Sequence, residues 1–283
     1  MPIHSQNEYR RLGDRIRNNP NEVTKEDLLM LQDLRVAFRD PLSVIFQIVE
    51  SLASKIDSSS VCTYRIKRIE SIISKLKRLP KMQLQRAEDI AGCRCIMSSE
   101  EKVYELFNLL HKKEDKLPFE IKNVNDYIQN PKSTGYKSIH VNVQIKGDGR
   151  RIEIQIRSLS HHNWATMVEI TDQIYDLHLK ELGREANLDL FDFHYLLSKN
   201  EKDIKEKQGR RIAEIAIKYN YLERIGGIFK QNYLTVRTQW SQERKGNKTF
   251  FLIATGKDGI PEFKLHSTFD DAEAAHFQLY HNN

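Results

Sequence analysis

Two carboxylates occupy positions from which they could hold a metal ion. Asp89 directly precedes the short apolar run from Ile90 to Met97, and Glu153 lies on the polar side of the alternating run from Arg151 to Arg157. The ends of strands are common places for chemistry in α/β proteins, although Asp89 taken alone would also suit a solvated turn. Carboxylate oxygens are ligands that Mg²⁺ accepts while substrate phosphates complete its coordination. The pair therefore predicts a magnesium site that acts on a phosphorylated substrate.

Positive charge gathers between Arg65 and Arg86, where eight Lys or Arg residues accompany a single acid, Glu70. Apolar residues recur at helical spacing from Ile69 to Leu76, so the segment is expected to form an amphipathic helix with a basic outer face. A solvated helix surface usually mixes the two signs of charge, so this imbalance favours phosphate binding. The sequence has no Gly-x-x-x-x-Gly-Lys-Ser/Thr loop, so side chains would hold the phosphates. A basic helix beside two acids predicts phosphoryl or pyrophosphoryl transfer.

A predicted β-hairpin positions Glu153. Apolar and polar residues alternate from Ile139 to Ile145 and again from Arg151 to Arg157, with the period of two that half-buried strands show. Asp148-Gly149 is a favoured pair for a two-residue turn. With that turn, the expected apolar pairs are Ile145–Ile152, Val143–Ile154 and Val141–Ile156, and the expected polar pairs are Gln144–Glu153, Asn142–Gln155 and His140–Arg157. The polar face could be an ordinary solvated surface, but its mixture of His, Asn, Gln, Glu and Arg favours a bound polar ligand.

The composition restricts the class of protein and its partners. Of the 283 residues, 39% are hydrophobic and 30% are charged, which is typical of a folded globular protein with one sizeable core and an appendage. The net charge of +6 and the pI near 9.0 favour anionic partners such as nucleotides or RNA. The sequence contains no membrane-spanning run, no signal-peptide pattern, and three cysteines that suit neither a disulfide framework nor a zinc site. These features predict a cytoplasmic protein without a membrane partner.

Four motifs, taken in order, resemble the synthetase domain of the RelA/SpoT family. They are YRIKRIESIISKL from Tyr64, EDIAGCRCIM from Glu88, DYIQNPKSTGYKSIH from Asp126, and RIEIQIRS from Arg151 followed by NWA. The similarity runs from about Ser51 to Tyr175 and is greatest to the stand-alone small alarmone synthetases of that family. The resemblance implies an α/β protein with a mixed β-sheet flanked by helices, a nucleotidyltransferase-like synthetase fold, here followed by a small α+β C-terminal extension.

The resemblance also implies an activity. The chain would be a (p)ppGpp synthetase, or GTP diphosphokinase, which uses Mg²⁺ to transfer the β,γ-pyrophosphate of ATP to the 3′-OH of GDP or GTP. Two alternatives stay open at this point. One is a toxin-like relative that pyrophosphorylates the 3′ CCA end of tRNA. The other is a non-catalytic nucleotide sensor, which the presence of Asp89, Glu153, Arg65 and Tyr136 disfavours.

By this resemblance, Asp89 and Glu153 would bind Mg²⁺ and act in catalysis, and Glu153 would also take the proton of the 3′-OH. Arg65 and Arg94 would enclose the adenine of ATP, a role that suits planar guanidinium groups. The residues expected to hold the ATP phosphates are Lys67, Ser71 and Lys75. The residues expected to bind the acceptor nucleotide are Tyr136, by stacking on the base, His140, close to the phosphates, and also Lys132 and Gln155.

The chain is expected to divide into four segments. These are N-terminal helices that pack on the core (1–56), with one helix starting at Pro41, the synthetase catalytic core (57–180), a helical segment (181–230) and a small β-rich accessory segment (231–283). In the last segment, YLTVRTQW from Tyr233, KTFFLIATG from Lys248 and PEFKLHSTF from Pro261 predict three strands, and DDAEAAHFQLYH predicts a final helix. This extension departs from the family pattern. It could serve assembly into a homo-oligomer, or bind a neutralising protein partner or an RNA.

Overall fold

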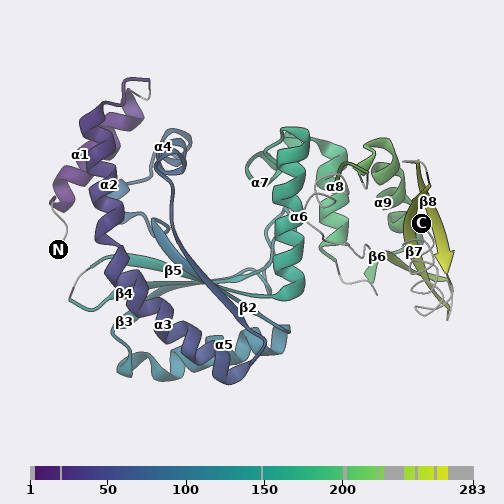
Figure 1. Cartoon of the computed structure of the whole chain (residues 1–283), viewed down its shortest axis with the longest axis horizontal. Helices are drawn as coiled ribbons and strands as arrows, with labels where there is room; N and C mark the ends of the chain where they lie inside the picture. The colour runs from purple at the N-terminus through teal and green to yellow at the C-terminus, as the bar shows by residue number, and fades with distance from the viewer. Residues whose placement is uncertain are drawn as a thin grey trace. The chain divides into compact units, whose positions relative to one another are not determined.

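The computed structural model describes residues 4–19, 21–147, 149–199, 203–221, 223–225, 239–245, 248–257 and 260–266 (Figure 1). The chain divides into two compact units. Unit 1 consists of Met1–Asn130 and Lys137–His162, and unit 2 consists of Pro131–Tyr136 and Asn163–Asn283. The main boundary falls inside helix α6 (Leu159–Tyr175). The four segments expected from the sequence have boundaries at other residues than these two units, and that division of the chain stays a prediction.

Unit 1 is built on a five-stranded sheet with the strand order β1-β2-β5-β4-β3. The strands are β1 (Val61–Ile66), β2 (Ala91–Met97), β3 (Phe119–Asp126), β4 (Ile139–Ile145) and β5 (Arg151–Ser158). Strands β2 and β5 run parallel, and the other neighbours run antiparallel. The mixed sheet flanked by helices that the sequence predicts is therefore confirmed.

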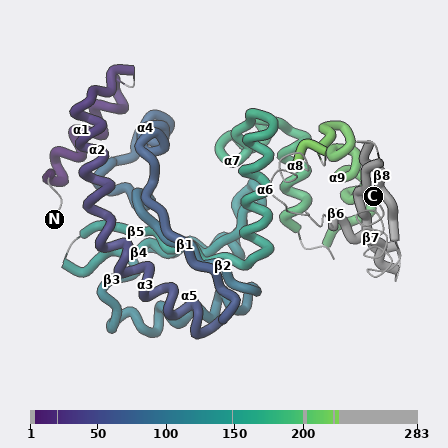
Figure 2. Tube along the Cα trace, viewed as in Figure 1, coloured from purple at the N-terminus to yellow at the C-terminus, as the bar shows by residue number. Residues whose placement is uncertain are grey.

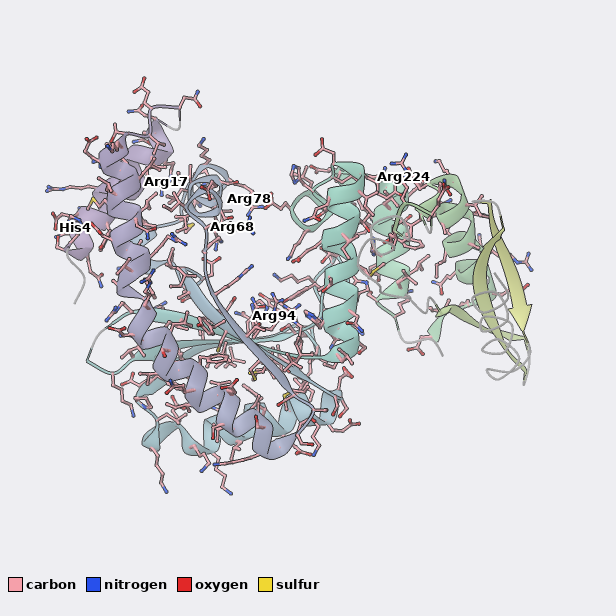
Figure 3. All side chains as sticks on the ribbon, in the orientation of Figure 1. His4, Arg17, Arg68, Arg78, Arg94 and Arg224 are labelled. Atoms are coloured by element: carbon pink, nitrogen blue, oxygen red, sulfur yellow. The ribbon has the colours of Figure 1, made fainter. Side chains whose placement is uncertain are left out.

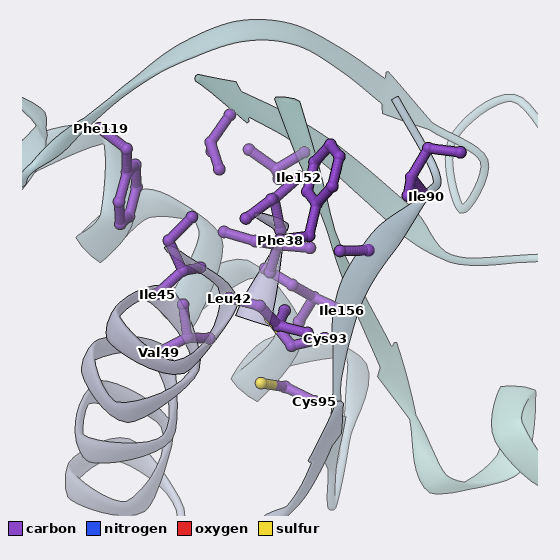
Figure 4. Packing of buried hydrophobic residues seen from close by; sticks show 14 of the residues in the cluster. Phe38, Leu42, Ile45, Val49, Ile90, Cys93, Cys95, Phe119, Ile152 and Ile156 are labelled. Atoms are coloured by element: carbon purple, nitrogen blue, oxygen red, sulfur yellow. The ribbon is translucent and has the colours of Figure 1, made fainter. Parts of the chain in front are cut away.

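One face of this sheet is the hydrophobic core of unit 1. Along β2 the odd-numbered residues from Ala91 to Met97 are buried, and along β5 Ile152, Ile154 and Ile156 are fully buried. Helices α3 (Arg39–Ile56) and α5 (Glu100–Lys113) cover this face (Figure 1), and Figure 4 shows α3 side chains packed against it. Because strand side chains alternate between faces, this burial leaves the polar residues on the opposite face.

Two of the three cysteines meet across the first strand pair. Cys62 of β1 lies directly opposite Cys95 of β2, with the two Sγ atoms 3.0 Å apart. Cys93 is also buried, and all three thiols are unbridged. Cys93 and Cys95 therefore lie on the same buried face of β2.

The N-terminal helices join the same buried cluster. Helices α1 (Gln6–Asn18) and α2 (Lys25–Ala37) each begin with a capping box, from Ser5 and from Thr24, which satisfies backbone donors at the helix start. Helix α3 begins at Arg39, two residues before the predicted start at Pro41. Proline fits there because the backbone nitrogens of a first turn need no helical partner.

The basic segment forms helix α4 (Ile69–Arg78), followed by the short 3-10 helix η1 (Leu84–Arg86). Ile72 and Leu76 are fully buried, while Lys77 and Arg78 at the end of the helix are exposed. Helix α1 packs against both α4 and η1, and Figure 2 shows α1 and α4 on the same side of the sheet. The predicted amphipathic basic helix is therefore confirmed, and the N-terminal helices hold it in place.

The β4–β5 hairpin differs in register from the prediction. The observed pairs include Val143–Ile152, Val141–Ile154 and Ile139–Ile156, each shifted by two residues from the expected partner. Gln144 therefore pairs with Arg151, Asn142 with Glu153, and His140 with Gln155. The physical reason is the conformation of the loop between the strands. Gly147 and Gly149 both have positive φ angles, and the backbone nitrogen of Ile145 donates to the Arg150 carbonyl oxygen. The turn is wider than the expected two residues. Because the shift is even, every side chain keeps its expected face.

Unit 2 contains helices and a second sheet. Its remaining elements are α7 (Leu179–Leu182), η3 (Gly183–Glu185), α8 (Leu188–Leu197), α9 (Glu206–Lys218), β6 (Gln239–Lys245), β7 (Lys248–Lys257) and β8 (Ile260–His266). Its core includes a polar cluster, which we call the hydroxyl–imidazole cluster. In it, Thr171 Oγ1 lies 2.6 Å from the Tyr221 hydroxyl oxygen and 2.8 Å from His194 Nε2. Among the helices that the structure describes, none has the length and apolar character needed to span a membrane.

The C-terminal strands form an antiparallel sheet in the order β6-β7-β8. The β-rich extension is therefore confirmed, and β7 and β8 coincide with the predicted strands at Lys248 and Pro261. Strand β6 begins at Gln239, whereas the sequence predicted a strand from Tyr233, most of which lies outside the described residues. The predicted final helix also lies outside them. The roles in assembly or partner binding that the sequence suggested stay predictions.

Candidate active site

The polar face of the five-stranded sheet carries a continuous set of hydrogen-bonding side chains. Across the strands, Gln155 lies between Arg94 and His140, and Glu153 lies between Gly92 and Asn142. Figure 3 shows Arg94 on the side of the sheet away from α3 and α5. The face predicted from alternation therefore exists, and its centre is the parallel pair β2 and β5.

Asp89 stands at the entrance to β2 and is held by two lysines. Lys67 Nζ and Lys75 Nζ each lie 2.7 Å from Asp89 Oδ2. Burial alone would raise the pKa of the Asp89 carboxyl, but the hydrogen bonds and charges of the two lysines outweigh burial and hold this pKa below its usual value. The other oxygen, Asp89 Oδ1, is buried and has no hydrogen-bond partner among the described residues. Asp89 thus presents one tied oxygen and one unpaired oxygen.

Glu153 occupies the middle of the face with 18% of its side chain exposed. His140 Nδ1 lies 2.7 Å from Glu153 Oε1, and Gln155 Nε2 donates to Oε2 at 2.6 Å. Burial tends to raise the pKa of Glu153, but the hydrogen bond and charge of His140 and the Gln155 contact lower it overall. The charge of Asp89 acts in the opposite direction, because like charges oppose ionisation. The two predicted carboxylates therefore interact electrostatically, and both are ionised at neutral pH.

Gly92 has no side chain, which leaves space for the neighbouring Glu153. A Cβ atom at position 92 would lie 2.7 Å from the Glu153 carbonyl oxygen and 3.5 Å from its Cβ. Any larger residue would collide with the Glu153 backbone on the neighbouring strand, which is a physical reason for glycine at this position.

Arg65 and Arg94 lie on the same polar face. Arg65 pairs with Gly92 and Arg94 pairs with Thr63, so the two arginines are diagonal neighbours across β1 and β2. Diagonal Cβ atoms of this kind are about 7–8 Å apart, which leaves room for one planar ring between two guanidinium groups. Arg94 Nε also donates to Gln155 Oε1 at 3.3 Å, which ties this arginine to the site.

The remaining predicted ATP-binding residues lie at the start of α4. Lys67 is anchored by its backbone, because its nitrogen donates to the Ile90 carbonyl oxygen at 2.8 Å and its carbonyl oxygen accepts from Arg35 Nε at 2.8 Å. Ser71 is exposed in the first turn of α4, and Lys75 follows one turn later on the same side. Ser71 presents a hydroxyl near the positive end of the helix dipole, where anions are stabilised, and the ammonium groups of Lys67 and Lys75 converge on Asp89 Oδ2.

Lys132 and Tyr136 belong to unit 2, whereas all the other predicted site residues belong to unit 1. Lys132 Nζ lies 5.3 Å from the centre of the Tyr136 ring. Between them, Gly135 has a φ of 88°, and a Cβ atom there would lie 2.3 Å from Ser198 Oγ. Glycine is therefore required at this position both for its backbone conformation and for close packing.

Sequence reasoning missed two residues that organise the face. Glu88 Oε2 accepts from Asn142 Nδ2 at 2.8 Å, and Glu88 also pairs with Arg151. Tyr127 packs its ring edge-on to His140, with the centroids 5.2 Å apart. The position of Glu88 next to Asp89 was a usable signal, but Tyr127 lies 13 residues before His140 and no local pattern connects them.

The residues fit the magnesium ion that the resemblance implies. In the described part of the chain, no group of three or more His, Cys, Asp and Glu side chains could enclose a metal ion. A shared ion with few protein ligands matches Mg²⁺, which keeps waters and substrate phosphates in its coordination shell. The unpaired Asp89 Oδ1 and the Glu153 carboxylate would be the oxygen donors for such an ion.

The part of the chain that contains these site residues is similar to known proteins. Residues 64–176 match the family model described as the region found in RelA/SpoT proteins. The GTP pyrophosphokinase YwaC of Bacillus subtilis is 37% identical over 114 residues, which cover 36% of this chain and 53% of that protein. The GTP pyrophosphokinase YjbM of the same organism is 29% identical over 127 residues, which cover 42% of this chain and 59% of that protein. The chain thus spans little more than half the length of these relatives.

The chain is also similar to a solved structure. The small alarmone synthetase 1 from Bacillus subtilis is 21% identical, and the alignment covers 71% of this chain and 97% of that one with a TM-score of 0.49. The residues matched by the family model include Arg65, Asp89, Glu153 and the segment from Lys132 to Tyr136. The resemblance carried by the four motifs is therefore confirmed, and it rests on residues 64–176, which match the region found in RelA/SpoT proteins.

Proposed function

We propose that this protein is a (p)ppGpp synthetase, which transfers the β,γ-pyrophosphate of ATP to the 3′-OH of GDP or GTP and releases AMP. The observation that carries the proposal is the placement of Asp89 and Glu153, two interacting carboxylates, beside Lys67 and Lys75 on the polar face of the sheet. The names of the curated relatives, both GTP pyrophosphokinases, support the same reaction.

In this proposal the ATP site lies along β1, β2 and the start of α4. Arg65 and Arg94 would hold the adenine between their guanidinium planes. Lys67, Ser71 and Lys75 would contact the phosphates, since two ammonium groups already converge at this point. Such contacts position the phosphates and neutralise their charge, which is the main contribution that proteins make to phosphoryl transfer.

Glu153 would act on the acceptor. A new bond forms between the acceptor 3′-oxygen and the β-phosphorus of ATP, and the bond from that phosphorus to the α,β-bridging oxygen breaks. The 3′-OH proton passes to Glu153, which is ionised and is oriented by His140 and Gln155. Mg²⁺ held by Asp89 and Glu153 would supply charge stabilisation for the transferred group. His140, Gln155, Lys132 and Tyr136 are the proposed contacts to the acceptor nucleotide.

Transfer of label tests the proposal. We expect the full chain, Mg²⁺ and γ-labelled ATP to produce AMP and a labelled 3′-pyrophosphorylated GDP or GTP. Deacylated tRNA forms a third arm, because the basic charge would also suit RNA. Label on tRNA alone would contradict GDP or GTP as the acceptor, and absence of transfer to any acceptor would contradict the enzyme activity. Glu105→Gln, on the exposed surface of α5, is the matched control for carboxylate substitutions.

A further inference from the structure

We infer that Asn142 is a third oxygen ligand of the metal ion at Asp89 and Glu153. This inference rests on the proposed function, because it assigns a further residue to the same site. Asn142 lies on β4 directly opposite Glu153 on β5. Directly opposite side chains in a sheet have Cβ atoms about 4.5–5.5 Å apart, so the amide and the carboxylate are adjacent on the polar face.

The orientation of the Asn142 amide follows from its partner. Asn142 Nδ2 donates to Glu88 Oε2 at 2.8 Å, and Glu88 also pairs with Arg151. An ionised carboxylate can only accept hydrogen bonds, so the amino end of the amide must face Glu88. The carbonyl end, Oδ1, must therefore face away from Glu88.

This carbonyl oxygen is left without a donor. Asn142 is only 5% exposed, and Oδ1 is buried without a hydrogen-bond partner among the described residues. Buried acceptors are rarely left unpaired, and where they are, they call for a functional explanation. Two neighbouring side chains, Glu153 and Glu88, carry carboxylates that cannot donate to it while ionised, and Asn123, opposite on β3, donates no hydrogen bond to it.

A divalent cation would satisfy this oxygen. Hard cations bind amide carbonyl oxygens together with carboxylates. Asp89 has the same arrangement as Asn142, since Lys67 and Lys75 tie down Oδ2 and leave Oδ1 buried and unpaired. Both side chains thus have one end held by a protein partner and the other end unpaired, and Glu153 supplies the third group. Three protein oxygens leave coordination positions of Mg²⁺ for phosphates, and Glu88 is the positioning residue that sets the direction of Asn142.

Binding of Mn²⁺ alone to the full chain tests the inference. The free ion can be followed by its electron paramagnetic resonance signal, which does not depend on turnover. We expect Asn142→Ala to weaken Mn²⁺ binding by at least about 10-fold. Asn142→Asp should keep Mn²⁺ affinity at or above the original value, because a carboxylate restores the oxygen although it cannot donate to Glu88. Asn123→Ala, at the exposed β3 position that pairs with Asn142, is the matched control and should bind Mn²⁺ normally.

The outcomes separate the two roles of Asn142. If Asn142→Ala and Asn142→Asp lose Mn²⁺ equally, Asn142 acts only as the donor to Glu88, and the inference is wrong. It is also wrong if Asn142→Ala binds normally while Glu153→Gln does not. If neither Asp89→Asn nor Glu153→Gln changes Mn²⁺ binding, the metal site of the proposed function itself fails. Thermal unfolding of each variant checks that the fold persists, and Glu88→Gln, which keeps a hydrogen-bond acceptor, should give a smaller loss than Asn142→Ala.

Discussion

The two units each contain a buried polar cluster, and the clusters differ in charge and access. In unit 2, the hydroxyl–imidazole cluster of Thr171, His194 and Tyr221 is at most 3% exposed. Burial lowers the pKa of His194 to about 3, so the imidazole is neutral. In unit 1, Asp89 and Glu153 keep 26% and 18% of their side chains exposed and stay ionised beside Lys67 and His140.

Unpaired atoms alone do not distinguish these clusters. His194 Nδ1 is buried without a partner among the described residues, as are Asp89 Oδ1 and Asn142 Oδ1. The difference is that the unit 1 atoms are oxygens and belong to a cluster in which the Asp89 and Glu153 carboxylates are ionised and partly exposed. A neutral, closed cluster contributes to packing and specificity, whereas charge combined with access permits chemistry.

The largest expected effect comes from the centre of the unit 1 site. Glu153→Gln should reduce pyrophosphate transfer by at least about 10²-fold, because in the proposed function it removes both a metal-facing charge and the proton acceptor. Its thermal unfolding midpoint should stay close to that of the original protein, since glutamine can still bond to Gln155. Steady-state transfer and calorimetry measure the two quantities. A stable variant with near-normal turnover would show that this cluster is structural like the other one.

Thr171→Val should have the opposite pattern. It leaves His194 Nε2 and the Tyr221 hydroxyl without their common partner, which should lower the free energy of unfolding by about 1–3 kcal/mol. Transfer activity at a temperature where the variant is folded should be unchanged. Denaturant titration and the label assay check both statements. A loss of turnover without a loss of stability would give unit 2 a part in the chemistry.

The pH dependence of stability should separate the clusters further. Unfolded histidine has a pKa near 6.5, so between about pH 6.5 and 3 the unfolded state binds a proton that folded His194 does not. Stability should therefore fall as pH falls through this range, by at most about 1.4 kcal/mol per pH unit for one proton. His161 in unit 1, whose pKa burial lowers to about 4, adds a second contribution.

Substitutions can test which residues cause this loss of stability at acidic pH. His194→Gln should reduce the slope of the stability profile between pH 6.5 and 4 and leave the part that His161 contributes. Glu153→Gln should leave that range unchanged and alter stability only below about pH 4.5, because a lowered carboxyl pKa contributes stability that is lost on acidification through the folded value. Urea unfolding at a series of pH values would measure this. A Glu153→Gln profile that changes near pH 6 would contradict the assignment.

The smallest expected effect concerns the rim of the unit 1 site. Arg65 is exposed, so Arg65→Lys should change stability by less than about 0.5 kcal/mol. It should weaken binding of a non-hydrolysable ATP analogue by about 0.5–1 kcal/mol, because lysine keeps the charge but loses the plane that stacks on adenine. Calorimetric titration beside Arg11→Lys, an exposed arginine of α1, provides the comparison. If the two variants bind the ATP analogue with equal affinity, Arg65 is not part of the ATP site.

Much of the unit 1 site could be predicted because it depends on local alternation. The period of two in β4 and β5 placed Glu153, Gln155 and His140 on one face, and an apolar run placed Asp89 at the start of β2. The register could not be predicted in the same way. A shift of two residues leaves every face unchanged, so the hydrophobic pattern does not distinguish the expected pairs from the observed ones. Only the loop geometry at Gly147 and Gly149 decides between them.

Contacts between distant segments were also beyond prediction. The pairing of Asp89 with Lys67 and Lys75 depends on how α4 packs against α1, and the donor to Glu88 comes from a residue 54 positions later. The hydroxyl–imidazole cluster joins Thr171 to Tyr221 across 50 positions, and none of its members stood out in the sequence. Helical periodicity reports which residues are buried, but not which buried polar atoms meet.

The two lysines that bond Asp89 have a consequence for how the binding of one ligand changes the affinity for another. They are the same ammonium groups that would contact phosphates, and an anion that recruits them would remove the charges that now compensate Asp89. The uncompensated carboxylate would then attract a cation more strongly. Anion and cation would thus bind with positive cooperativity, and thermodynamic reciprocity requires each to raise the affinity for the other by the same factor. Such a site would favour a metal–nucleotide complex over either component alone.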